Sequence, residues 1–591
     1  MTIRLGFVIA AMLLVACDPQ EATLPDSAVA PGKSTSPASA EAQFADTVYT
    51  NGRIYTVNED QPWAEALAAK SGRLLVVGSG ADVEAVTGDG TQVVDLGGRF
   101  VMPGINDLHH HGIDVSTTAM DPNALAIAED QKGSPEALVA AIKEFAESHP
   151  DLPLIYAEDF ADGMFPGNNG PKELLDEADR DRPIIVLSSG GHAFWGNSKA
   201  FEAAGISADT PDPEYGLIGR KPGSMEPIGG VHENAMQLFW ALKDMPSRES
   251  IAAGVREHVK RVNALGITGV RIAGITQNHL EETVAADEAG ELNAYHSLAF
   301  HWRTSYIAQR DQDLDLIRQQ ILESKSVATE NVASGVLKYY ADGAPASKTS
   351  YLLEDYENDP GNRSQLQMDE DLFQEEFAFW TENGITTMTH VTGDAAARSV
   401  IDAVEAAQAT HGKNGVRHHM THSVMVDPAD LARLKPLGMV VDVSPAVAAP
   451  MSFHDAYKHH YGERHEQFFP ARGLIDAGAN FMVASDFPVG PDNPWTNIEI
   501  WTTRMNPWGN AEGTLGAQSA ITLEEALKGA TLAGAYGLYM EEEFGSLEAG
   551  KRATFIVLNH NLFEIPPADL SETKVVQTYF NGRLVYDASL D

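Results

Sequence analysis

Cysteine is almost absent from this chain. Cys17 is the one cysteine among 591 residues, so a disulfide within the chain is excluded. The apolar run from Leu5 to Ala16 has 12 residues, too few for a membrane span, which needs about 20. These features argue against a disulfide-stapled domain and against a protein with several membrane spans.

Basic residues are also scarce. Lys and Arg number 41 against 84 Asp and Glu, and the formal net charge is -43. Nucleic-acid binding without sequence preference needs Lys and Arg to displace phosphate counterions, and docking on anionic lipid through charge has the same need. We therefore expect no nucleic-acid partner. A content of 43% hydrophobic and 21% charged residues indicates an ordinary globular protein.

The N-terminus has the pattern of a targeting segment. Arg4 precedes the apolar run, which ends at Cys17 in the sequence Leu-Val-Ala-Cys. This end resembles the lipobox of bacterial lipoproteins, in which the cysteine is lipidated and becomes the first mature residue. The resemblance predicts a signal peptide over 1–17 and a lipid anchor in the cell envelope, facing the periplasm. Asp18 resembles a signal for inner-membrane retention. The alternative is an ordinary secretory signal.

Three further regions follow from composition and pattern. Residues 18–43, rich in Ala, Ser, Pro and Asp, predict a flexible tether. Residues 44–100 and 540–591 contain short strands with tight-turn Asn-Gly pairs at 51–52 and 581–582, which predict two hairpins. We expect the two ends to form one small β-sandwich around an inserted domain.

The segment 101–539 alternates between helices and apolar strands. Capped helix starts occur at Ser134-Pro135, at Asp427-Pro428 and at Thr522 with Glu525. Short apolar runs between helices lie at 184–187, 384–389, 439–443 and 481–484. This alternation predicts an α/β fold with a parallel sheet, and its length favours a (β/α)8 TIM barrel with inserted elements. A doubly wound open sheet is the alternative, although no Gly-rich nucleotide fingerprint follows an early strand.

Polar residues stand where several of these strands end. His109 and His111 share one face of a strand, and His110 points to the other. The ends of three further predicted strands carry His390, His422 and Asp486. The carboxyl ends of barrel strands form the catalytic rim, so we expect these side chains to form a metal site there.

Lys338 lies within an apolar strand. A lysine there is either an edge residue with its amine in water or an inward residue. Burial of an inward amine lowers its pKa, and a neutral amine can react with carbon dioxide to form a carbamate able to bridge two cations.

These motifs resemble the amidohydrolase superfamily, specifically the amidohydrolase 3 branch of YtcJ-like and N-substituted formamide deformylase-like proteins. The resemblance runs from about Thr47 to Tyr586. Its motifs are Pro103 to His111, Lys338 to Gly343, His390 to Asp394, Arg417 to His422, and Ser485 to Val489. The sequence departs from the family at Asn106, Ile272 and Ser444, and the last two departures leave the substrate open.

The resemblance implies a hydrolase with two Zn²⁺ ions, or another divalent metal. His109, His111 and Asp486 would hold one ion and His390 and His422 the other, with carbamylated Lys338, formed from carbon dioxide, as the bridge. Asp486 would be the catalytic residue that moves a proton while a metal-activated hydroxide cleaves a non-peptide amide, formamide or imide. His192 and Asn197, in a stretch specific to the branch, would bind the small-molecule substrate, and a hydrogen-bonded structural histidine is the alternative for His192.

Other interpretations remain open at this point. The same site could serve a metal-dependent deaminase, lactonase or isomerase, or the chain could be a lipid-tethered binding protein without catalysis. His454, His459, His460 and His465 form a histidine-rich segment that we expect to be a solvated loop. A serine hydrolase is disfavoured because the chain has no Gly-x-Ser-x-Gly motif.

Overall fold

The computed structural model describes residues 44–128, 131, 134–301, 310–444, 448–450, 454–509 and 511–590. Cys17, the signal peptide over 1–17 and the tether over 18–43 lie outside these residues. Residues 44–591 form one compact unit. No helix in the described part of the chain has the length and apolar character that crossing a membrane requires.

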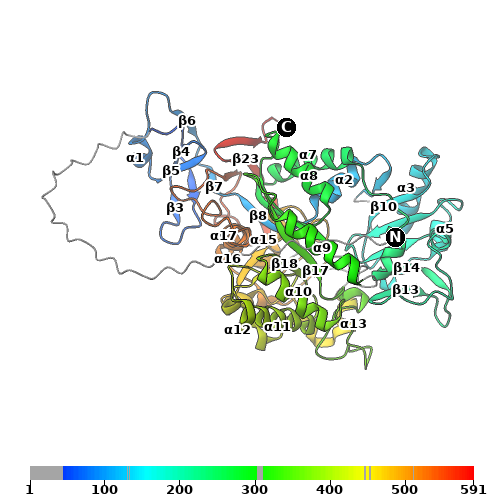
Figure 1. The fold of residues 1–591 in the computed structure, drawn as a ribbon. Helices are drawn as coiled ribbons and strands as arrows, with labels where there is room; N and C mark the ends of the chain where they lie inside the picture. Colours follow the sequence, from blue (N-terminus) through cyan, green and yellow to red (C-terminus); the bar gives the residue numbers. More distant parts are fainter. Residues whose placement is uncertain are drawn as a thin grey trace, which may run out of the picture. The chain divides into compact units, whose positions relative to one another are not determined.

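Eight parallel strands form the centre of the molecule (Figure 1). In spatial order they are β8 (Ile105–His110), β15 (Ile267–Ile275), β16 (Tyr295–His301), β17 (Val332–Tyr340), β18 (Thr386–His390), β19 (His419–Thr421), β20 (Val440–Val443) and β21 (Asn480–Val483). The segment after β21 closes the barrel against β8, because the Asp486 N–H donates to the His109 carbonyl at 2.7 Å. The barrel prediction is confirmed, and a closed ring of strands excludes the open sheet.

Helices alternate with these strands along the chain. They are α2 (Gly112–Met120), α7 (Arg248–Ala264), α8 (Gln277–Glu288), α9 (Arg310–Ser324), α10 (Glu370–Glu382), α11 (Asp394–His411), α12 (Pro428–Leu437), α13 (His454–Tyr461), α14 (Ala471–Asp476), α15 (Pro494–Thr503), α16 (Leu523–Ala530) and α17 (Leu532–Gly537). α12 begins behind the Asp427 cap, and α16 begins with the Thr522–Glu525 capping box. The histidine-rich segment forms α13 and a 3-10 helix (Gly462–Gln467), so the loop prediction is wrong there.

A second sheet is inserted between α2 and α7. Its order is β13 (Gly216–Arg220), β14 (Pro227–Glu233), β12 (Ala193–Gly196), β11 (Ile184–Ser188), β10 (Ile155–Phe160) and β9 (Ala124–Ala126), with α3 (Pro135–Ser148), α4 (Lys172–Leu175), α5 (Ser198–Ala203) and α6 (Gln237–Trp240). Residues 184–187 therefore belong to the inserted sheet and not to the barrel. An apolar run buried on both faces has the same pattern in either sheet, so periodicity alone does not separate them.

Two smaller sheets lie outside the barrel, the first built from amino-terminal strands and the second from strands of both ends of the described chain. The first contains β5 (Arg73–Gly78), β4 (Ala66–Lys70), β1 (Thr47–Thr50) and β6 (Gln92–Asp95), with α1 (Gly80–Glu84). The second contains β24 (Arg583–Asp587), β23 (Val575–Phe580), β22 (Phe555–Leu558), β7 (Phe100–Pro103), β2 (Arg53–Tyr55) and β3 (Trp63–Ala64). The rings of Tyr49, Phe555 and Tyr579 pack between them at centroid distances of 4.6 to 5.2 Å.

The two Asn-Gly turns have different outcomes. β23 and β24 pair as a hairpin through Asn581-Gly582, as predicted. β1 and β2 do not pair with each other: β1 pairs with β4 and β6, and β2 pairs with β3 and β7. The hairpin predicted at Asn51-Gly52 is therefore wrong. Asn51 has the expected positive φ of 57°, but its turn carries the chain from one sheet to the other.

Candidate metal centre

The three consecutive histidines at the end of β8 lie in two different environments. The His109 side chain is fully buried inside the barrel. The His110 ring lies against His258 of α7, with ring centroids 5.3 Å apart, on the outside of the strand. His111 follows as the residue before α2, and its ring centroid is 5.5 Å from that of His109. Strand alternation thus places the first and third histidines together, as the sequence predicts.

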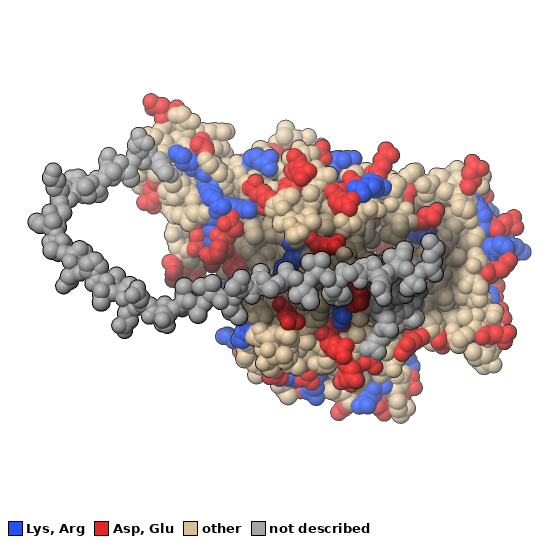
Figure 2. All heavy atoms as spheres, in the orientation of Figure 1, with Lys and Arg blue, Asp and Glu red and all other residues tan. Residues whose placement is uncertain are grey.

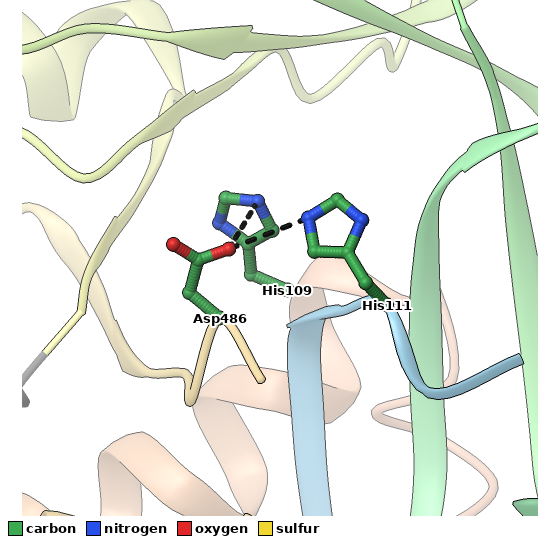
Figure 3. A group of neighbouring side chains, drawn as sticks. All are labelled: His109, His111 and Asp486. Carbon is green, nitrogen blue, oxygen red and sulfur yellow. Dashed lines mark ion pairs between the residues drawn. The ribbon is translucent and has the colours of Figure 1, made fainter. Parts of the chain in front are cut away.

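Asp486 faces these two histidines from the segment after β21. Its Oδ1 lies 3.2 Å from His109 Nε2 and 3.4 Å from His111 Nε2 (Figure 3). Its backbone is in the left-handed region, with φ of 55°, and its N–H donates to the His109 carbonyl. The backbone bond at the barrel seam holds the carboxylate in front of the histidine pair.

Lys338 of β17 points into the barrel and is 1% exposed. Its Nζ lies 2.9 Å from His109 Nε2 and 3.3 Å from Thr421 Oγ1. Burial lowers the pKa of this amine to about 8, although Asp486 and Asp442 oppose the shift. The edge-residue interpretation is excluded, and the amine lies where a bridging group is expected.

His390 and His422 complete the convergence. Their ring centroids are 4.3 Å apart, and the His422 ring is 4.7 Å from that of His109. His390 Nε2 donates to the Gly343 carbonyl at 3.0 Å, which leaves Nδ1 with its lone pair. Burial is the largest cause that holds the pKa of both rings well below the ordinary value, so both are neutral, as metal ligands must be.

A buried carboxylate, Asp342, positions the loops around His390. Its oxygens accept hydrogen bonds from the backbone N–H groups of Tyr351, Thr392 and Gly393 at 2.7 to 2.9 Å. Asp342 follows β17 and Gly393 follows β18, so the carboxylate ties the ends of two neighbouring strands together. This explains why the Asp-Gly and Gly-Asp parts of the two motifs occur beside the candidate ligands.

The two predicted substrate-binding residues have different environments. The His192 ring lies beside the site, 4.8 Å from the His390 ring between centroids, and its Nδ1 donates to Glu233 Oε2 at 2.9 Å. Burial lowers the pKa of His192, but the carboxylates of Glu233, Asp162 and Asp486 together outweigh burial, so the net shift is upward.

Asn197 does not reach the site. Its Oδ1 accepts from the N–H of Ile184 and of Ala200, where it caps α5, and its Nδ2 donates to two backbone carbonyls. The substrate-binding prediction for Asn197 is corrected, because the fold uses its whole amide to fasten α5 to β11.

Sequence reasoning missed Asp442 and Glu233. Asp442 is fully buried in β20, where its Oδ1 accepts a hydrogen bond from the His422 N–H at 3.0 Å. A carboxylate in the middle of the apolar run 439–443 was the available signal for it. Glu233 ends β14, far from every site motif along the chain, and carried no such signal.

The donor set fits a divalent metal. His109, His111 and Asp486 offer ligand atoms that all lie within 4.8 Å of one another, and they are the one such group found among the described residues. Ligands about 2.1 Å from a tetrahedral ion stand about 3.4 Å from each other, close to the 3.2 and 3.4 Å seen here. Imidazole nitrogen with carboxylate oxygen suits a borderline ion such as Zn²⁺.

The chain is similar to known proteins over most of its length. N-substituted formamide deformylase of Arthrobacter pascens is 26% identical over 557 residues, 92% of this chain and 99% of the deformylase. YtcJ of Bacillus subtilis is 26% identical over 550 residues, 92% of this chain and 99% of YtcJ. An uncharacterized metal-dependent hydrolase from Pyrococcus horikoshii shares the fold, with a TM-score of 0.67 and 20% identity over 88% of this chain and 99% of its own.

A family model also matches most of the chain. The amidohydrolase family model covers residues 92–586, from the first small sheet through the barrel to β24. Its match contains the three residues of the convergent group, His109, His111 and Asp486. The chain therefore belongs to the amidohydrolase family and is a metal-dependent hydrolase.

Proposed function

We propose that this hydrolase cleaves a carbon–nitrogen bond other than a peptide bond in a small molecule, namely an amide, a formamide or an imide. The observation that carries the proposal is the convergence of His109, His111 and Asp486 around one point, with the Lys338 amine 2.9 Å from His109. The similarity to a formamide deformylase over nearly the full length supports this bond type.

The proposed centre holds two Zn²⁺ ions or another divalent metal. His109, His111 and Asp486 would hold one ion, and His390 and His422 the other. The neutral Lys338 amine would add to carbon dioxide, with loss of a proton, and the resulting carbamate would bridge the two. When bound, the metal polarises the substrate carbonyl and lowers the pKa of water from about 15.7 to about 7.

Side chains of the protein would transfer the proton and contact the substrate. Asp486 has Oδ1 against two histidines and Oδ2 3.6 Å from His422 Nδ1, so it lies at the centre of the donor set. In the proposal it accepts a proton from the attacking water and returns it to the departing nitrogen. His192, held by Glu233, faces the same space from the inserted sheet and would contact the substrate.

Metal removal and reconstitution test this function. Purified full-length protein is stripped with a chelator, reloaded with Zn²⁺ and screened against N-acyl amines, formamides, cyclic imides and lactones. We expect amine release from a carbon–nitrogen substrate that disappears on stripping and returns on reloading. A folded wild-type chain that binds no metal and hydrolyses nothing would instead support the binding-protein interpretation, and lactone cleavage alone would overturn the bond type.

We also propose that the protein is a lipoprotein of the bacterial cell envelope, anchored through Cys17 to the inner membrane and facing the periplasm. The support is the apolar run that ends at the one cysteine of the chain. Cys17→Ser should move the protein from the membrane fraction to the soluble fraction and abolish labelling by a radioactive fatty acid. Unchanged labelling would contradict the anchor.

A further inference from the structure

Asp442 is an unusual residue for its position. It lies in β20 between Val441 and Val443, inside the barrel, and its side chain has no exposed surface. Removing a carboxylate from water costs several kcal/mol unless partners compensate it. The groups that surround Asp442 are therefore informative about why it is there.

One carboxylate meets both halves of the proposed metal centre. Asp442 Oδ1 accepts the His422 backbone N–H at 3.0 Å, and Oδ2 lies 3.6 Å from His109 Nδ1. His422 has a φ of 64°, a left-handed conformation that costs about 1–3 kcal/mol and must be held by its surroundings. His109 Nδ1 is buried without a hydrogen-bond partner among the described residues, so the nearby carboxylate is the charge that it faces.

A second chain of contacts fixes Asp442 from behind. The Arg271 guanidinium donates to His419 Nδ1 at 3.3 Å, and His419 Nε2 lies 2.7 Å from Asp442 Oδ2. Because a guanidinium can only donate, His419 Nδ1 is the acceptor and its Nε2 carries the proton that faces Asp442. Arg271 is itself held by the Gly537 carbonyl at 2.6 Å and by Ser297 Oγ at 3.2 Å.

The charge of Asp442, 3.6 Å from His109 Nδ1, favours one tautomer of His109. A carboxylate can only accept, so Asp442 favours the proton of His109 on Nδ1. Nε2 then keeps its lone pair on the side where Asp486 Oδ1 is 3.2 Å away. Carboxylates that orient metal-bound histidines act in this way, and their loss typically lowers metal affinity or activity about 10- to 100-fold.

We propose that Asp442 is a positioning residue of the metal centre, which fixes the ring of His109 and the backbone of His422 while His419 and Arg271 hold it in place. This inference rests on the proposed function, because it assigns His109 and His422 to that centre. Asp442 thus contacts residues of both ligand groups through one buried side chain. Arg271 reaches Asp442 only through His419.

Asp442→Asn tests the proposal in the full-length protein. The asparagine amide has the same shape as the carboxylate. In one orientation it places an N–H₂ donor opposite His109, and in the other it removes the oxygen that accepts the His422 N–H. Zn²⁺ affinity is measured by competition with a chromophoric chelator, and the visible spectrum of the Co²⁺-loaded protein reports ligand geometry. We expect Zn²⁺ affinity to fall about 10- to 100-fold and the Co²⁺ spectrum to shift.

Asp430→Asn is the matched control. Asp430 is also a buried carboxylate, 3% exposed, but it lies on α12 and pairs with Arg398 and Arg433 at 2.9 and 2.8 Å. We expect this variant to keep the wild-type affinity and spectrum. An equal loss in both variants would overturn the proposal, because it would reflect the removal of any buried charge.

The remaining outcomes are also decisive. A folded D442N protein with wild-type affinity and spectrum overturns the positioning role and leaves the proposed function intact. A wild-type protein that binds no divalent metal overturns both. If D442N fails to fold, His419→Gln carries the test: a smaller loss of affinity with a shifted Co²⁺ spectrum supports the proposal, and an unchanged affinity and spectrum overturns it.

Discussion

At the residue scale, Asp486 is the side chain to which the proposed function assigns both metal binding and proton transfer. Its oxygens lie within 3.6 Å of nitrogens of His109, His111 and His422. Asp486→Asn keeps one ligand oxygen but removes the group that accepts a proton. We expect kcat to fall about 10²- to 10⁴-fold while most of the bound metal remains. Turnover of the substrate found by screening, together with zinc content, checks this.

A control for this change is Asp430→Asn, which leaves the barrel interior untouched. It should retain the turnover of the wild type. Undiminished kcat in the Asp486→Asn protein would remove the proton-transfer role from Asp486, and loss of the metal along with activity would restrict that residue to metal binding.

The sequence predicts the positions of the six candidate ligands better than it predicts their supports. His109, His390 and Asp486 each stand at the carboxyl end of an apolar run, and parallel strands bring those ends together. Asp442 stands inside the apolar run 439–443 and not at its end, and its contact with His109 joins segments far apart in the sequence, so this reasoning assigns it no role. The substrate-binding prediction for Asn197 was wrong because this residue caps α5.

At the element scale, Gly393 shows how tightly the ends of β17 and β18 are joined. A Cβ added there would lie 1.9 Å from the Tyr351 carbonyl oxygen and 2.5 Å from its carbon, both backbone atoms that cannot turn aside. Gly393→Ala must therefore move the turn after His390. We expect the free energy of unfolding to fall by about 1–3 kcal/mol, measured by urea titration.

Gly80→Ala serves as the comparison for this change. A Cβ at Gly80 meets nothing within 4 Å, and the residue begins α1 with an ordinary φ. This variant should match or slightly exceed the wild-type stability. If both variants lost the same stability, crowding against Tyr351 would not be the cause.

A buried histidine between α10 and β18 makes the free energy of unfolding depend on pH. His418 is buried there, and its ring nitrogens bond to Thr381 Oγ1 and Thr387 Oγ1 at 2.9 and 2.8 Å. Burial lowers its pKa from 6.5 to about 4. The unfolded chain takes up this proton below about pH 6.5 and the folded chain only near pH 4, so stability is lost as pH falls between these values.

His418→Gln should reduce that loss. The amide still meets the two hydroxyls but takes up no proton, so the drop in unfolding free energy between pH 7.5 and 4.5 should shrink by up to about 3 kcal/mol. Urea unfolding of metal-free protein at both pH values measures it. A substitution at the exposed His459 should preserve the wild-type drop. An unchanged drop in the His418→Gln protein would contradict the assignment.

Helix starts are the elements that the sequence predicts best. Ser134, Asp427 and Thr522 cap α3, α12 and α16 where expected, because a cap is a contact within one turn of chain. The Asn51-Gly52 hairpin failed because a turn fixes the local backbone but not the partner of each strand. β1 and β2 find better partners in two different sheets, and that choice depends on the packing of both chain ends.

At the scale of the whole molecule, acidic charge is spread widely over the surface. Acidic side chains are distributed across the face drawn in Figure 2, with basic ones among them. Some are neutralised in local pairs such as Arg433 with Asp402 and Arg417 with Glu541. The excess of 84 acidic over 41 basic residues still leaves a net charge of -43, whose self-repulsion opposes the compact state.

Salt should therefore stabilise this protein near neutral pH. The screening length falls from about 30 Å at 0.01 M to about 10 Å at 0.1 M, which weakens long-range repulsion more than close ion pairs. We expect the unfolding temperature at pH 7 to rise by several degrees when NaCl increases from 0.01 to 0.3 M. Near the isoelectric point of about 4.7 the net charge vanishes, so the same salt step should have little effect or a destabilising one. An unfolding temperature that falls with salt at pH 7 would mean that the surface ion pairs outweigh the net repulsion.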